Sequence, residues 1–183
     1  MKNPKIFIVS GKARNGKDTT CNMIREYYED KGLKTINLQY SSYIKEYAKK
    51  ISDWDGSEET KPRELLQYLG TEIIREKIDY NFFVNRIIDD IKVYSFFFDI
   101  ITISDARAKV EIDKVRDSFS NVKAIKVIRT NFYDGLTCEQ RKHFTETYLD
   151  DYENYDYILE NDSTLDDLNK KVIKLLEEIN NEY

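Results

Sequence analysis

The stretch GKARNGKDT at residues 11–19 constrains the fold of this chain more than any other feature. It lies directly after the apolar run at residues 6–9 and directly before a stretch with helical periodicity. Two glycines separated by four residues, with a lysine after the second, have the spacing of a phosphate-binding loop, or P-loop. In such a loop the backbone N–H groups and the positive end of the helix dipole bind the anion together. The pattern therefore predicts a polyphosphate site between a strand and a helix.

Strand-like runs recur along the chain and alternate with helix-like stretches, which favours a parallel α/β fold. Several runs are rich in Ile, Val and Phe without clean alternation, as is typical of strands buried on both faces. Strands are expected at residues 5–10, 34–40, 99–104, 123–129 and 155–160. The first helix is expected at about residues 17–31 and the last at about 165–179. Two segments fit the alternation less well, namely residues 41–94 and 130–154.

The composition excludes several classes of protein. The chain has 183 residues, and no apolar run approaches the roughly 20 residues of a membrane span. Its 29 Lys and Arg against 34 Asp and Glu give a net charge of −5, which disfavours general nucleic-acid binding. No signal peptide is visible, and one histidine cannot build a multi-histidine metal site. We therefore expect a cytoplasmic protein that binds neither nucleic acid nor membrane.

The residue after the loop lysine departs from the common P-loop pattern. A Ser or Thr usually stands there and binds Mg²⁺, whereas this chain has Asp18 and places the hydroxyl one position later, at Thr19. Asp18 could bind Mg²⁺ through water or cap the helix N-terminus, and both interpretations stay open. Lys17 is expected to reach the β and γ phosphates, and Arg14 to touch the transferred phosphoryl group.

A second acidic motif, IITISDAR at residues 100–107, is an apolar strand that ends in an acid and an arginine. In a P-loop fold this matches Walker B geometry, in which a carboxylate at the end of a strand lies beside the phosphates. Asp105 is expected to orient Mg²⁺ or its waters, and Arg107 to stabilise charge on the transferred group. The alternative is that Asp105 only caps the helix that follows.

Residues 61–75 predict a helix with two different faces. At roughly 100° per residue, one arc is apolar, with Leu65, Leu66, Leu69 and Ile73. The opposite arc carries Arg63, Gln67, Gly70 and Thr71, with Arg75 at its flank. An arginine, an amide and a glycine suit a phosphate, a base edge and the close approach of a ligand. The alternative is a solvated face with a packing glycine.

Together these segments resemble the deoxynucleoside monophosphate kinases of phage and bacterial type, within the adenylate kinase-like P-loop kinases. The resemblance rests on SGK and GKDT in the loop, RELLQ and LGTE at residues 63–72, ISDAR at 103–107, HFTE at 143–146 and NDSTL at 161–165. It implies a three-layer fold with a five-stranded parallel sheet ordered 2-3-1-4-5. It also implies a core at residues 1–40, 95–129 and 155–183, a monophosphate-binding region at about 41–94 and a small lid at about 130–154.

The implied reaction is γ-phosphoryl transfer from ATP with Mg²⁺ to a (deoxy)nucleoside monophosphate, by a monomer or a homodimer. The expected catalytic residues are Lys17, Arg14, Asp105, Arg107 and Arg141. The expected ATP-binding residues are Gly11, Lys12, Ala13, Asn15, Gly16, Lys17, Asp18, Thr19, Thr20, Arg129 and Asn161. The expected substrate-binding residues are Arg63, Gln67, Gly70, Thr71 and Arg75, and the expected metal-binding residues are Thr19, Asp18 and Asp105.

Other functions remain open at this stage. A small-molecule kinase with another acceptor, such as a phosphomevalonate kinase, shares the fold and also shows Gly-Lys-Asp loops. A nucleotide-dependent switch is a different class, and DWDG at residues 53–56 matches the Asp-x-x-Gly of GTPases. However, that motif follows a helix-like stretch, and no Asn-Lys-x-Asp guanine motif occurs. A nucleotide-binding protein without kinase activity is the third possibility.

Overall fold

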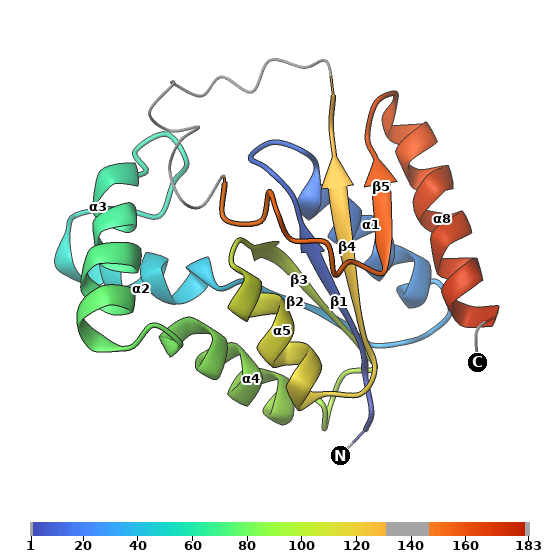
Figure 1. Ribbon diagram of the computed structural model, residues 1–183, viewed down its shortest axis with the longest axis horizontal. Helices are drawn as coiled ribbons and strands as arrows, with labels where there is room; N and C mark the ends of the chain where they lie inside the picture. Colours follow the sequence, from blue (N-terminus) through green and yellow to red (C-terminus); the bar gives the residue numbers. More distant parts are fainter. Residues whose placement is uncertain (1, 131–146, 182–183) are drawn as a thin grey trace.

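The computed structural model describes residues 2–130 and 147–181 (Figure 1). Five parallel strands form one sheet in the order β2-β3-β1-β4-β5, which confirms the predicted fold class. The strands are β1 (Lys5–Ser10), β2 (Thr35–Leu38), β3 (Ile100–Ala106), β4 (Val122–Ile128) and β5 (Tyr157–Glu160). The helices are α1 (Lys17–Glu29), α2 (Ser41–Ile51), α3 (Arg63–Tyr68), the π-helix η1 (Leu69–Ile78), α4 (Phe82–Tyr94), α5 (Lys109–Ser118) and α8 (Leu165–Asn181).

The central strand β1 divides the core into two halves. Its side chains alternate, so that Ile6 and Ile8 pack with α4 and α5, whereas Phe7 and Val9 pack with α1 and α8. Figure 1 shows these two helix pairs on opposite sides of the sheet. These four side chains are almost completely buried. Burying each of them stabilises the folded state by roughly 1.5–3 kcal/mol, so the loop that follows β1 is attached to a stable part of the fold.

The apolar side chains along one face of α8 are buried, except at the first residue of the helix. Leu168, Val172, Leu175, Leu176 and Ile179 lie in the core. Leu165, the first residue of the helix, remains 65% exposed. None of the helices in the described parts of the chain is long and apolar enough to cross a bilayer.

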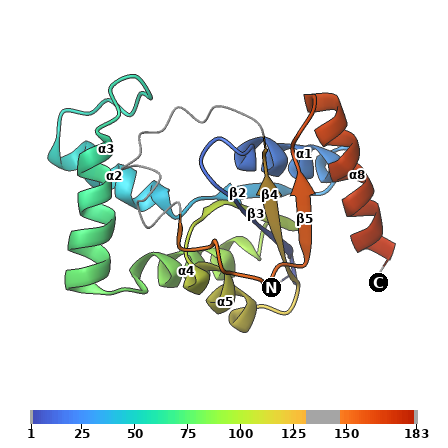
Figure 2. The same ribbon diagram turned by 45° about the horizontal axis from the view of Figure 1, so that its top comes forward.

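The segment between β2 and β3, called the insert below, carries α2, α3, η1 and α4 (Figure 2). Helix α4 covers the sheet, whereas α2, α3 and η1 lie to one side of it. The single helix predicted over residues 61–75 is in fact α3 followed by the π-helix. A π-helix has wider turns, so the 100° pattern fails beyond Leu69. Gly70 and Ile74 are buried there, and Leu69 and Ile73 only partly so.

Candidate active site

The loop between β1 and α1 has the tight curvature that a phosphate-binding loop requires. Gly11, Arg14 and Gly16 all have positive φ angles, of 146°, 59° and 96°. A Cβ on Gly11 would lie 2.4 Å from the backbone oxygen of Val127, and one on Gly16 would lie 2.6 Å from Nδ2 of Asn161. Both glycines are therefore needed for the backbone conformation and for the space around it.

We expect Gly11→Ala to lower the free energy of unfolding more than the same substitution at an ordinary loop glycine would. Positive φ alone costs an L-residue roughly 1–3 kcal/mol, and the new methyl group also meets the rigid backbone of β4. Gly32→Ala is the matched control, because Gly32 has a φ of 78° and a Cβ added there would meet no atom within 4 Å. Urea unfolding measures both variants. An equal loss of unfolding free energy would contradict the close packing against Val127.

Two buried asparagines hold the loop against the ends of β4 and β5. Asn15 donates from Nδ2 to the backbone oxygen of Val127 at 3.0 Å. Asn161 donates from Nδ2 to the backbone oxygen of Asn15 at 2.9 Å. Asn161, expected near the base of ATP, therefore also supports the loop itself.

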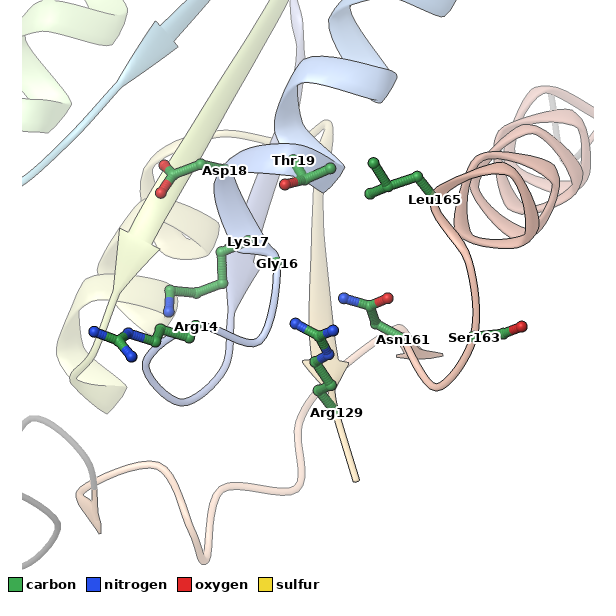
Figure 3. A pocket seen from close by; sticks show the side chains of 9 residues that line it. All are labelled: Arg14, Gly16, Lys17, Asp18, Thr19, Arg129, Asn161, Ser163 and Leu165. Carbon is green, nitrogen blue, oxygen red and sulfur yellow. The ribbon is translucent and has the colours of Figure 1, made fainter. Parts of the chain in front are cut away.

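The side chains that follow the loop point in different directions. Lys17 is 7% exposed, and its Nζ donates to the backbone oxygen of Lys12 at 2.8 Å, inside the curve of the loop. Asp18 is exposed and accepts a hydrogen bond from Gln39, and Figure 3 shows it pointing away from Asn161 and Leu165. The Thr20 side chain, also predicted to bind ATP, is fully buried and lines neither of the two cavities at the loop.

Two cavities adjoin the loop, one at each half. The first, of about 330 Å³, is lined by Arg14, Gly16, Lys17, Asp18, Thr19, Arg129, Asn161, Ser163 and Leu165 (Figure 3). The second, of about 340 Å³, is lined by Gly11, Lys12, Ala13, Asn15, Ala106, Arg107, Lys126, Val127, Ile128, Arg129, Leu149, Asp150 and Tyr155. Arg129 lines both cavities, and the loop separates their remaining walls.

Asp105 lies beside the start of the loop, because Ala106 of β3 is paired with Ser10 of β1. Its two carboxylate oxygens accept hydrogen bonds from the backbone N–H groups of Tyr40 and Ser41, at 2.8 and 2.9 Å. Asp105 thus caps the N-terminus of α2, and not the helix that follows it in sequence.

The predicted substrate-binding face does not form one continuous surface. Arg63 is exposed and pairs with Glu58 at 3.1 Å, and Gln67 is also exposed. A Cβ on Gly70 would lie 2.9 Å from Cδ1 of Ile44, so the packing of α2 occupies the space expected for a ligand.

Arg75, by contrast, is buried with the carboxylate of Glu111. Burial raises the pKa of the Glu111 carboxyl above its ordinary value, and the nearby Arg75 guanidinium opposes that rise. Glu111 also accepts hydrogen bonds from the backbone N–H groups of Arg107 and Ala108.

The segment at residues 147–155 connects the loop, the insert and α5. Asp150 pairs with Lys12 at 3.0 Å, and Asp151 pairs with Lys109 at 2.8 Å. The hydroxyls of Tyr80 and Tyr148 lie 2.8 Å apart. Burial first, and then this contact, raise the pKa of Tyr80 to about 12. Arg141, together with Lys142 and His143 of the HFTE region, lies outside the described residues.

The fold and the loop define the chain as a P-loop α/β protein, and kinases of known structure share this fold. An APS kinase from Mycobacterium tuberculosis, solved with AMPPNP and APS, aligns with a TM-score of 0.55 at 15% identity, over 97% of this chain and 99% of that chain. A dephospho-CoA kinase from Campylobacter jejuni aligns with a TM-score of 0.53 at 16% identity, over 97% of each chain. A gluconokinase from Sinorhizobium meliloti aligns with a TM-score of 0.54 at 12% identity, over 100% of this chain and 99% of that chain.

The family follows from the sequence itself. The profile of the deoxynucleotide monophosphate kinases matches residues 26–172, which is most of the chain, and the chain belongs to that family. A search of curated proteins finds no match. The protein is therefore a kinase-like phosphotransferase. The matched residues begin after the P-loop, so the loop geometry and the family match support the kinase assignment from separate parts of the chain.

Proposed function

We propose that this protein transfers the γ-phosphoryl group of ATP, bound with Mg²⁺, to a (deoxy)nucleoside monophosphate and releases the diphosphate. The observation that carries this proposal is the pair of cavities that meet at one phosphate loop. Phosphoryl transfer needs a donor and an acceptor held on opposite sides of the transferred group. The family match favours a nucleotide as the acceptor.

The first cavity suits the donor. The loop amides, the N-terminus of α1 and Lys17 supply positive charge for the β and γ phosphates. Leu165 points towards Thr19 and offers an apolar surface for a base, and Arg129 lies across the cavity from it (Figure 3). Gly16 lines this cavity, whereas Gly11, Lys12, Ala13 and Asn15, which are also proposed to bind the ATP phosphates, line the second cavity.

The candidate ligands fit Mg²⁺. This ion is usually held by one or two carboxylates together with substrate phosphates, and it supplies charge neutralisation when bound. Among the described residues no cluster of three or more Asp, Glu, His or Cys side chains forms a protein-only metal site, which agrees with that mode. Asp18 is exposed and Thr19 faces the first cavity, whereas Asp105 already accepts two backbone N–H groups.

The second cavity suits the transferred group and the acceptor phosphate. Lys12, Arg107, Lys126 and Arg129 give it positive charge, against the single carboxylate of Asp150. In the proposed mechanism Arg14, Arg107 and Arg141 neutralise the transferred group, and Arg75 binds the acceptor phosphate with help from Arg63, Gln67 and Thr71. An acceptor phosphate is already ionised near neutral pH, so the reaction needs no general base. Regions 41–94 and 130–154 are proposed to close over the substrates and exclude water.

A panel of deoxynucleoside and ribonucleoside monophosphates with Mg-ATP tests the proposal, with ADP formation as the readout. We expect rapid turnover with at least one deoxynucleoside monophosphate and only slow hydrolysis without an acceptor. Phosphomevalonate and other small phosphorylated acceptors form a second arm. If only these small phosphorylated compounds were turned over, the acceptor would not be a nucleotide and the proposal would be wrong.

The GTPase-like motif at residues 53–56 has a structural explanation. Trp54 is buried, and its Nε1 donates to the backbone oxygen of Ser57. Asp55 accepts from the backbone N–H of Ser57 and the hydroxyl of Thr60, within a turn that follows α2. The motif therefore stabilises a turn in the insert, and nothing in its contacts favours a nucleotide switch.

A further inference from the structure

Glu111 is a buried carboxylate that contacts two of the arginines proposed to bind phosphate groups, the side chain of Arg75 and the backbone N–H of Arg107. Its side chain is almost fully inaccessible, and Oε1 is paired with Nη2 of Arg75. Oε2 accepts hydrogen bonds from the backbone N–H groups of Arg107 and Ala108, at 2.6 and 3.0 Å. One oxygen thus holds a guanidinium from the insert, and the other holds the backbone at the end of β3.

The burial of this pair makes each charge depend on the other. The Arg75 side chain is 10% exposed, and its guanidinium also lies 5.3 Å from the ring centre of Phe83. A buried carboxylate is stable in its charged form only when it is paired and hydrogen-bonded. A guanidinium presents its N–H donors in a planar fork, a geometry that suits a phosphate as well as a carboxylate.

The same stretch of chain also fixes the start of the insert. Asp105 caps α2 through the backbone N–H groups of Tyr40 and Ser41. The hydroxyl of the buried Tyr40 donates to the backbone oxygen of Glu111 at 2.6 Å. The segment from Asp105 to Glu111 therefore contacts the insert at two points. One is the start of the insert, at Tyr40 and Ser41, and the other is Arg75.

We infer that Glu111 is a positioning residue for the acceptor phosphate. It orients Arg75 towards the acceptor phosphate through charge, and it places Arg107 beside the transferred group through a backbone hydrogen bond. Glu111 does not itself touch the substrate in this account. The inference rests on the proposed function, because it assigns the acceptor phosphate as the anion.

Steady-state kinetics of Glu111→Gln, Arg75→Met and the double variant test this role. Gln keeps the shape and one acceptor oxygen but removes the charge. We expect each single variant to raise the KM for the acceptor about tenfold or more, with the KM for ATP changed less than about twofold. The acceptor KM of the double variant should be no higher than that of the more impaired single variant, because the effects of residues that act as a unit are not additive.

Asp113→Asn, on the same helix, is the control. Asp113 accepts a hydrogen bond from the Tyr152 hydroxyl and is not paired with Arg75, so its loss should leave both KM values unchanged.

Three kinetic outcomes would overturn the inference. A lower kcat with an unchanged acceptor KM would show that Glu111 only stabilises the start of α5. Additive effects in the double variant would show that it does not act through Arg75. Urea unfolding identifies any single variant that fails to fold. The double variant, which leaves no buried charge unpaired, then supplies the comparison: its acceptor KM should still rise about tenfold over the wild-type value, and an unchanged acceptor KM would overturn the inference.

The proposed function and this inference can fail separately. If the wild-type protein phosphorylates no monophosphate, the proposed function fails. The NMR signal of the Arg75 side-chain Nε–H then still tests the positioning. We expect slow hydrogen exchange at this group in the wild type and at least tenfold faster exchange in Glu111→Gln. Equal exchange rates in the two proteins would overturn the role of Glu111.

Discussion

Lys17→Ala should lower kcat by about 10²–10³-fold, the loss typical of removing one preorganised charge from a developing anion. Lys17 lies inside the curve of the loop, where its Nζ donates to the backbone oxygen of Lys12. Removing the amine therefore takes away charge at the β and γ phosphates without disturbing the core. Initial rates at saturating Mg-ATP and acceptor measure the effect, and thermal unfolding checks the fold.

The control for this variant is Lys31→Ala. Lys31 follows α1 at its opposite end, and its Nζ donates to the Tyr27 hydroxyl on the surface. We expect this variant to keep the wild-type rate within about twofold, because a surface charge so far from the loop contributes little. If Lys17→Ala retained substantial activity, the assignment of the loop as the donor site would be wrong.

Asp105→Ala should reduce both stability and activity. The variant leaves the backbone N–H groups of Tyr40 and Ser41 without their carboxylate, which costs roughly 1–3 kcal/mol of unfolding free energy. It also removes the hydrogen bonds that hold the N-terminus of α2 to the end of β3, and we expect this to weaken acceptor binding. Urea unfolding measures the first effect, and the acceptor KM measures the second.

A magnesium titration separates the two roles proposed for Asp105. Asp105→Asn keeps one carbonyl oxygen as a cap but loses the charge. If Asp105 also binds Mg²⁺ or its waters, the Mg²⁺ concentration for half-maximal rate rises in this variant. If that concentration stays unchanged while stability falls, Asp105 acts only as the cap of α2. Asp55→Ala is the control, because Asp55 also accepts a backbone N–H but lies in the exposed turn after α2.

The parts of the structure that depend on local sequence were predictable. The loop requires glycines at two fixed positions, and β1 and α1 begin at the predicted residues because apolar runs and helical periodicity are local signals. The sheet order came from the resemblance to a known family, and the structure confirms it.

The parts that depend on tertiary contacts were not predictable. The capping-box motif does not identify Glu111. That motif has Ser or Thr three positions before the Glu, whereas this chain has Ala108 there. Asp105 caps a helix 64 residues away in sequence, which no local pattern can indicate. Gly70 matched a ligand-binding face only under regular helical geometry, and the π-helix turns it towards Ile44.

The central claim is that the γ-phosphoryl group reaches a monophosphate and not water. ATP labelled in its γ-phosphate, incubated with Mg²⁺, the protein and the acceptor that turns over fastest, tests this directly by ³¹P NMR or mass spectrometry. We predict that the label appears in the β-phosphate of the nucleoside diphosphate, and that Lys17→Ala slows its appearance by about 10²–10³-fold. Label found only in inorganic phosphate would contradict the assignment of this protein as a monophosphate kinase.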